Sequence, residues 1–217
     1  LVARVIERVV AHGLIDRLVV ATDSPMVARV AERTGITAVM TSADHQTGTE
    51  RVAEVAGLEE FSGFDIIANI QGDEPFISRA ALAGALDRVR TGDDIGTAAA
   101  PLDPALARDP GRVKVITDRK GRALYFSRAM IPHCRDQEED TTGLYWQHIG
   151  LYVCRREALA QWVGLCPTRM EAVERLEQLR ALEHGMSIGV ARLEEAAPPG
   201  IDTPDDLRRA EAHWYDS

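Results

Sequence analysis

The sequence predicts an α/β fold in which a doubly wound, mixed and mostly parallel sheet carries a small β-hairpin lobe. First, short apolar segments typical of strands alternate with helical segments through the first hundred residues. Second, polar residues follow two of these strands directly, at Asp23 and at Gln71. Third, a turn at Lys120 and Gly121 separates two short strand-like segments. The β-α-β rhythm indicates a mostly parallel sheet, and the late turn indicates a hairpin.

The elements of the first half follow from local signals. Residues 1–12 carry apolar side chains at helical spacing. Ser24 and Pro25 are typical of a helix start, and Gly35 marks the end of that helix. A polar loop then leads to a helix near Thr49. The strands expected in this half are "RLVVATD", "ITAVM", "IIANI" and "IGTAAAPL", and one more helix is expected over residues 78–90.

The second half has a different order of elements. "RVKVITDRKGRALYFSRA" predicts a hairpin, and "QHIGLYVCR" and "SIGVARL" predict further strands. A polar, acidic loop is expected over residues 135–143, with helices over residues 156–163 and 170–184 and after Thr203. Because no linker separates independent domains, we interpret residues 1–217 as a single domain with a lobe around residues 112–155.

Composition narrows the classes of function. The chain has 217 residues and a formal net charge of −9, and an acidic chain without a basic stripe argues against binding to duplex nucleic acid. No apolar segment approaches the roughly eighteen residues of a membrane helix. Small anionic substrates are compatible with this charge, since a local pocket can oppose it. Cys134, Cys154 and Cys166 fit neither a zinc pattern nor a disulfide framework, so we expect reduced thiols and a cytoplasmic protein.

One buried strand, "IIANI", runs directly into Gln71, Gly72, Asp73 and Glu74. Ligands of open α/β sheets bind beyond the carboxyl ends of the strands, which places this segment at a site. Gly72 lets a ligand approach the backbone, and a carboxylate here suits Mg²⁺, which binds one or two carboxylates together with phosphate oxygens and water. The alternative is that Asp73, Glu74 and Pro75 only form a turn and cap the next helix.

Two loops carry further candidates. In "GIDTPDDL" the residues from Thr203 onward are explained as a helix start, but Asp202 is not. Taken alone, Asp202 is more often a loop carboxylate than a ligand. "DHQTGTER" places hydroxyl groups and a flexible turn at a helix N-terminus, which suits an anion or a base edge. The alternative is a capping box of Thr47 or Thr49 with Glu50.

Polar residues also lie at strand ends and on a helix of the second half. A single His or Tyr at a strand end is usually structural, and the polar face of an amphipathic helix is most simply exposed to solvent. The strand-end residues are Ser127, Arg128, His148 and Tyr152. In "MEAVERLEQLR" the expected inner residues are Val173, Leu176 and Leu179, and the expected solvated ones are Glu174, Glu177 and Gln178.

Taken together, these segments resemble the 3-deoxy-manno-octulosonate (Kdo) cytidylyltransferase family in content, order and spacing over nearly the whole chain. The combination is specific, although no single segment is. The matching segments are "VATDSPMVA", "MTSADHQTGTER", "NIQGDEPFI", "VKVITDRKGRALYFSRAMIP", "QHIGLYVCR", "MEAVERLEQLRALEHG" and "GIDTPDDL".

The resemblance implies a nucleotide-diphospho-sugar transferase fold, usually as a homodimer, with dimerisation and sugar binding near the hairpin lobe. It implies that CTP and Kdo react to give CMP-Kdo and pyrophosphate for lipopolysaccharide biosynthesis, without nucleic-acid or membrane partners. It also implies Mg²⁺ held by two catalytic aspartates, Asp73 and Asp202. The implied cytidine-side residues are Gln71, Gly72, Asp44, Thr47 and Gly48, and the implied sugar-side residues are Arg128, His148, Tyr152, Glu177 and Gln178.

The resemblance has one departure, at the start of the chain. The family begins with a strand and a phosphate-binding loop of the pattern P-A-R-x-x-S-x-R-x-x-x-K, and Leu1 corresponds to the helix that follows this loop. We therefore expect a longer full protein, with open edges on the neighbouring strands when the first strand is missing. The 217 residues alone are expected to fold poorly, or to bind sugar without turnover.

Two alternatives stay open at this stage. The first is a cytidylyltransferase for a related sugar acid, 8-amino-Kdo or sialic acid, although "YFSRA" and "LEQLR" disfavour sialic acid. The second is a non-catalytic sugar- or nucleotide-binding relative, against which the presence of both Asp73 and Asp202 argues.

Overall fold

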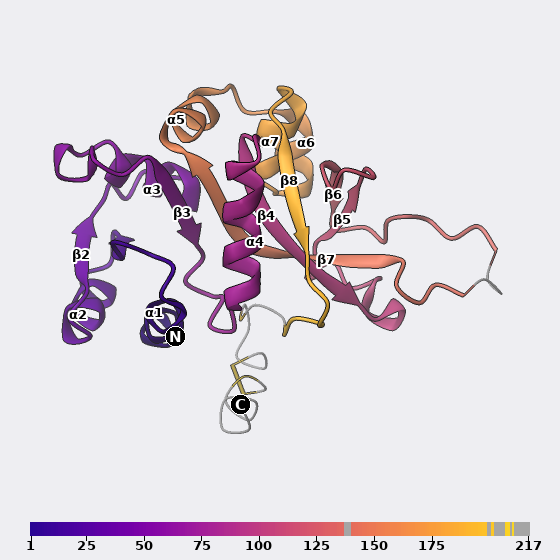
Figure 1. Cartoon of the computed structure of the whole chain (residues 1–217), viewed down its shortest axis with the longest axis horizontal. Coiled ribbons are helices and arrows are strands. Elements are labelled where there is room, and N and C mark those ends of the chain that lie inside the picture. Colours follow the sequence, from indigo (N-terminus) through magenta and orange to yellow (C-terminus); the bar gives the residue numbers. More distant parts are fainter. Residues whose placement is uncertain (137–139, 199–200, 202–206, 209, 211–217) are drawn as a thin grey trace.

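The computed structural model describes residues 1–136, 140–198, 201, 207–208 and 210, and Figure 1 shows their arrangement. The helices are α1 (Val2–His12), α2 (Pro25–Arg33), α3 (Gly48–Ala56), α4 (Arg79–Arg90), α5 (Arg156–Gly164), α6 (Arg169–Glu174) and α7 (Gln178–Glu183). The strands are β1 (Val19–Thr22), β2 (Thr37–Met40), β3 (Ile66–Ile70), β4 (Ile95–Leu102), β5 (Lys114–Thr117), β6 (Ala123–Ser127), β7 (Tyr145–Arg155) and β8 (Ile188–Arg192). Short 3-10 helices span Glu59–Phe61 and Pro104–Leu106.

The predicted α/β class with a mixed sheet is confirmed. One sheet has the order β6-β5-β7-β4-β8, with β3 also paired to β7, and a second sheet pairs β1 with β2 in parallel. Strand β7 runs antiparallel to β3, β4 and β5, whereas β4 and β8 are parallel. Strands β3, β4, β5 and β8 therefore share one direction, so β3 brings its carboxyl end to the same edge as β4 and β8.

One face of the sheet is covered by α1 and α4. Val9 of α1 and Leu82 and Ala85 of α4 pack in a cluster with Leu151 and Val153 of β7. Ser78 begins α4 by accepting a hydrogen bond from the backbone N–H of Ala81, so the helix starts where the sequence predicts. Figure 1 shows α4 lying across the sheet.

The opposite face carries the second core, formed with α3, α5, α6 and α7. Trp162 of α5 and Leu179 of α7 pack with Tyr152 and Cys154 of β7. Odd-numbered residues 149–153 of β7 thus face α4, and even-numbered residues 152 and 154 face α5 and α7, as the two-residue period of a strand requires. Helices on both faces make the sheet doubly wound.

An apolar groove lies between β1 and β3. Arg51, on the first turns of α3, has Nη2 3.3 Å from Asp23 Oδ2 after β1, and Gly48 at the start of α3 lies against Gln71 after β3. The carboxyl ends of both strands therefore meet at the start of α3, and the strands run in the same direction. They are not paired with each other among the described residues. Cavities of about 600 Å³ and 230 Å³ lie between them.

The hairpin of the second half is confirmed. β5 and β6 pair antiparallel around Gly121, whose φ of 76° requires glycine-like freedom. Both strands belong to the main sheet through the pairing of β5 with β7. In Figure 1 the start of β7 extends away from the helices.

The single helix expected over residues 170–184 is wrong. Arg175 adopts φ 52°, which ends α6, and α7 begins only at Gln178. This break rotates the following residues, so Glu177 is partly buried and Gln178 is buried, whereas Val173 is 76% exposed. The interpretation of Glu177 and Gln178 as a solvated face, and of Val173 as an inner residue, is therefore wrong. The expected start of the last helix at Thr203 lies outside the described residues.

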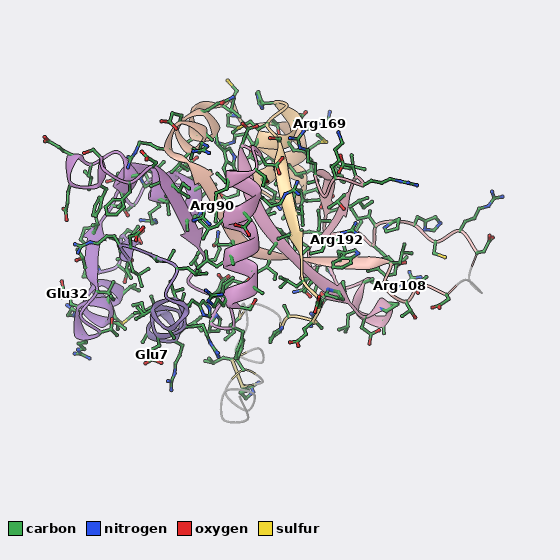
Figure 2. All side chains as sticks on the ribbon, viewed as in Figure 1. Glu7, Glu32, Arg90, Arg108, Arg169 and Arg192 are labelled. Atoms are coloured by element: carbon green, nitrogen blue, oxygen red, sulfur yellow. The ribbon has the colours of Figure 1, made fainter. Side chains whose placement is uncertain are left out.

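No helix within the described ranges is long and apolar enough to cross a membrane. Many charged side chains lie on the outside of the molecule. The labelled examples in Figure 2 are all exposed: Glu7, Glu32, Arg90, Arg108, Arg169 and Arg192.

Candidate active site

The segment after β3 forms a turn at the carboxyl edge of the sheet. The backbone N–H of Glu74 donates to the carbonyl of Gln71 (3.2 Å), which closes a turn over Gly72 and Asp73. Gly72 is exposed and Asp73 is partly buried. The turn alternative is thus correct for the backbone, and the same turn leaves the segment at the edge where ligands of such sheets bind.

The start of α3 meets this turn. A methyl group on Gly48 would lie 3.3 Å from Gln71 Nε2 and 3.8 Å from Asn69 Nδ2, so the bare glycine lets the Gln71 amide approach the helix N-terminus. Asn69 Nδ2 donates to Thr49 Oγ1 (3.3 Å). The structure therefore brings together Gln71 and Gly48, two of the predicted nucleotide-side residues.

Thr47 and Asp44 lie in the loop before α3. Thr47 caps the helix, because its Oγ1 accepts from the backbone N–H of Glu50 (3.2 Å), while Glu50 Oε2 accepts from Gln46 N–H (2.8 Å). Half of the predicted capping box is therefore present. Asp44 is exposed, and its backbone N–H donates to Ser42 Oγ (3.1 Å). The first turn of α3 therefore lies beside the Gln71 amide.

His148 and Tyr152 lie on one face of β7, with ring centroids 5.5 Å apart. Thr97 Oγ1 donates to the carbonyl of Leu151 (2.6 Å) and therefore accepts from His148 Nε2 at 2.9 Å. Burial lowers the pKa of His148 to about 3, so the ring is neutral at physiological pH. Burial also raises the pKa of Tyr152, and the carboxylates of Glu177 and Glu74 add to that rise. Both side chains thus act as neutral hydrogen-bonding groups.

Glu177 lies between the two sides of the candidate site. Its carboxylate oxygens are shielded from solvent. Burial raises the pKa of Glu177, and the hydroxyl groups of Thr49 and Thr47 act in the opposite direction. The carboxylate therefore lies close to both the N-terminal turn of α3 and Tyr152. Gln178, the next residue, is buried, with 2% of its surface exposed.

Arg128, unlike the other predicted sugar-side residues, is held mainly by hydrogen bonds to main-chain carbonyls. Its guanidinium donates to the carbonyls of Glu174 (2.8 Å), Pro110 (3.1 Å) and Arg175 (3.4 Å), and its backbone N–H donates to Glu174 Oε2 (2.9 Å). In this structure Arg128 clamps the end of β6 to the break between α6 and α7. Its role towards a sugar carboxylate stays a prediction.

Two buried cations support the site and were missed by the sequence reasoning. Lys114 is fully buried, and its ammonium donates to the carbonyls of Asp109, Arg112 and Arg128. Arg180 makes two hydrogen bonds to Glu171 (2.8 and 2.7 Å), and these hold the pKa of Arg180 above its usual value. The one available signal for Lys114 was its place inside a strand, where a charged side chain needs several partners.

A magnesium ion fits the chemistry of this edge. Asp73 presents one carboxylate, and its carbonyl accepts from the backbone N–H of Ile201 (3.0 Å), so residue 201 lies at the turn. The predicted second ligand, Asp202, lies outside the described residues. Within the part of the chain that the structure describes, no group of three or more His, Cys, Asp or Glu residues could hold a metal. An ion bound through one or two carboxylates and the phosphates of a nucleotide does not need such a group.

Comparisons with known proteins assign the chain first to a class. A family model described as "Cytidylyltransferase" matches residues 1–188. The chain belongs to this cytidylyltransferase family, and it is a nucleotidyltransferase.

Within this class, two similar relatives share one name. A 3-deoxy-manno-octulosonate cytidylyltransferase of Gemmatimonas aurantiaca is 52% identical over 217 residues, which cover 99% of this chain and 84% of the relative. The enzyme of that name from Methylococcus capsulatus is 43% identical, over 98% of this chain and 86% of the relative. A solved CMP:2-keto-3-deoxy-manno-octonic acid synthetase complexed with CTP has a TM-score of 0.88 and 34% identity, covering 99% of this chain and 87% of that one. The family resemblance inferred from the sequence is confirmed.

Proposed function

We propose that this protein activates Kdo with CTP, giving CMP-Kdo and pyrophosphate. The observation that carries the proposal is the match, over 99% of this chain, to a CMP:2-keto-3-deoxy-manno-octonic acid synthetase whose structure contains CTP. The geometry supports it, because the Gln71 amide, the start of α3 and the Asp73 turn meet at one edge of the sheet. Lipopolysaccharide biosynthesis is the use of CMP-Kdo that the family resemblance implies.

The reaction joins two anions, so positioning and charge neutralisation dominate its catalysis. The anomeric hydroxyl oxygen of Kdo bonds to the α-phosphorus of CTP, the bond to the β-phosphate bridging oxygen breaks, and the hydroxyl proton is released. Gln71 and Gly48 bind the cytidine side. His148 and Tyr152, both neutral, hydrogen-bond sugar hydroxyls without adding charge beside the reacting phosphate.

Asp73 is the residue we propose to hold Mg²⁺, with Asp202 as its partner ligand. When bound, the ion stabilises the negative charge of the phosphates and of the leaving pyrophosphate. The homodimer and the cytoplasmic location stay predictions, as does the assignment of residues 112–155 to dimerisation and sugar binding.

The test is pyrophosphate release with CTP, Mg²⁺ and Kdo, measured on the 217 residues and on a version extended at its N-terminus by the strand and phosphate-binding loop of the family; the variants are compared in whichever version turns over. We expect Asp73→Asn to lower the Mg²⁺-dependent rate by about a hundredfold while the fold is kept, because one charged ligand is lost. Asp65→Asn is the matched control, since it makes the same change at the other, exposed end of β3. Circular dichroism reports whether both variants stay folded.

Three other outcomes of this test would each favour a different interpretation of the protein. A near-normal rate for Asp73→Asn would remove this residue from the metal site. Release with 8-amino-Kdo or sialic acid, but not with Kdo, would assign the protein to a related sugar acid. Binding of CTP without turnover of any of the three sugars would favour a non-catalytic relative.

A further inference from the structure

Glu74 lies beside Asp73 but has its own contact across the sheet. Its Oε1 accepts a hydrogen bond from the backbone N–H of Gly150 in β7, at 3.0 Å. The carbonyl of Gly150 in turn accepts from the backbone N–H of Gln71 (3.3 Å). Gly150 is therefore joined to the turn after β3 through both of its backbone groups.

This contact replaces a hydrogen bond that is missing from the β3–β7 ladder. The regular register ends at Ile70 opposite Leu151, and the next pair would be Gln71 opposite Gly150. In a regular antiparallel pair the Gln71 carbonyl would accept from Gly150 N–H. That carbonyl instead accepts from Glu74 N–H and closes the turn. The Glu74 carboxylate supplies the acceptor that the turn has removed, so Gly150 N–H keeps a partner.

The side chain of Glu74 also occupies the space left by a glycine. A methyl group on Gly150 would come within 2.9 Å of Glu74 Oε1 and 3.2 Å of Gln71 Cγ. Because side chains alternate along a strand, position 150 is on the same face as His148 and Tyr152. The Glu74 carboxylate is therefore fitted between two sugar-side residues, next to the turn that carries Asp73.

We propose that Glu74 is a positioning residue of the transfer reaction, whose carboxylate fixes the Asp73 turn against β7 at Gly150. It holds the metal-side carboxylate at a fixed place relative to the sugar-side face of His148 and Tyr152. This proposal rests on the proposed function, in which Asp73 holds Mg²⁺ and β7 binds Kdo. Hydrogen-bonded residues that orient a metal ligand typically contribute about tenfold to a hundredfold in metal affinity or activity.

The test measures Mn²⁺ binding in the presence of CTP by electron paramagnetic resonance, and the Mg²⁺ concentration for half-maximal pyrophosphate release. We expect Glu74→Ala to weaken both by about tenfold. Glu74→Gln keeps an Oε1 acceptor and is expected to change both by less than about threefold. Hydrogen exchange at the Gly150 amide should be slow in the unaltered protein and in Glu74→Gln, and fast in Glu74→Ala.

A double-mutant cycle isolates the contact. Gly150→Ala should weaken Mn²⁺ binding in the unaltered protein, because its methyl group would lie 2.9 Å from Glu74 Oε1, and should add little in the Glu74→Ala background. Asp94→Ala is the matched control: Asp94 Oδ2 accepts from Ser187 N–H (2.7 Å) at the amino ends of β4 and β8. This control should lower the urea midpoint without changing Mn²⁺ binding.

The outcomes separate this proposal from the proposed function. If Glu74→Ala binds Mn²⁺ and CTP normally while Asp73→Asn does not, the positioning role is overturned and the metal site stands. Additive effects of Glu74→Ala and Gly150→Ala would also overturn it. If neither Asp73→Asn nor Glu74→Ala changes Mn²⁺ binding, the metal assignment fails and the role of Glu74 fails with it.

Discussion

At the scale of the residue, His148 shows how tertiary contacts decide the charge of a site group. Thr97 has one hydroxyl hydrogen and gives it to the carbonyl of Leu151, so its oxygen can only accept from His148 Nε2. Burial disfavours the imidazolium, which lowers the pKa of His148 to about 3. The ring is therefore a neutral donor at Nε2 and an acceptor at Nδ1.

This shift has a consequence for stability. Since the pKa of His148 is lowered on folding from 6.5 to about 3, the unfolded chain binds more protons between these values, and stability falls as pH drops through this window. When the pH falls from 7.5 to 5.0, we expect the free energy of unfolding of the unaltered protein to drop by about 2 kcal/mol more than that of His148→Gln. Urea denaturation at both pH values measures the difference.

The control for this prediction is His133→Gln, which changes an exposed histidine. This variant should follow the pH dependence of the unaltered protein. An equal pH dependence in His148→Gln would mean that His148 is protonated in the folded state above pH 5.

At the scale of the element, the break between α6 and α7 shapes the region predicted to bind the sugar. A capping box at Thr168 and Glu171 begins α6, and Arg175 ends it in the left-handed region after only six residues. The carbonyls of Glu174 and Arg175, which the break frees from helical pairing, accept from Arg128. The break thus sets Glu177 at the start of α7, facing α3.

The left-handed conformation of Arg175 predicts opposite effects for two substitutions. Arg175→Gly should raise the free energy of unfolding by up to about 1 kcal/mol, since glycine adopts a positive φ without strain. Arg175→Val should lower it by about 1–2 kcal/mol, because a β-branched side chain is strained there. Urea denaturation measures both.

A glycine substitution inside a helix is the matched control. Arg169→Gly changes an exposed arginine at the first residue of α6, where the backbone is helical, and should lower stability slightly. A loss of stability for Arg175→Gly as large as that for Arg169→Gly would contradict the strain assigned to Arg175.

At the scale of the whole molecule, the two sheets differ in how well they are buried. Six of the eight residues of β4 are buried in succession, whereas β2 has no buried residue. Strand β1 pairs only with β2 among the described strands, and the groove beside it contacts α1 and α3. An isolated two-stranded sheet has little stability of its own.

We therefore expect the first sheet to open at a lower free energy than the second. Hydrogen exchange followed by mass spectrometry should show faster exchange at Val19–Thr22 and Thr37–Met40 than at Ile95–Leu102 and Tyr145–Arg155. Addition of CTP should slow the exchange of α3 more than that of α5, because we propose that Gly48 of α3 binds the cytidine side. Equal protection of both sheets would mean that the molecule opens as one unit.

The candidate site could be predicted where its residues are contiguous in the sequence. The buried strand before Gln71, the turn at Asp73 and the loop before Gly48 are contiguous in sequence, and their quoted segments carried the family resemblance. The neutral state of His148, the clamp formed by Arg128 and the ladder contact of Glu74 each join residues far apart in the chain. Local sequence patterns do not predict contacts between residues so far apart in the chain.

The sequence by itself determined the α/β class, the hairpin around Gly121 and the family, because periodicity, turn residues and ordered motifs are local properties. The tertiary structure alone decided that β7 lies antiparallel between β3 and β4, since strand order depends on packing against α4 and α5. It also decided the helix break at Arg175 and the burial of Glu177. A left-handed residue and a buried carboxylate are tolerated only when surrounding contacts stabilise them.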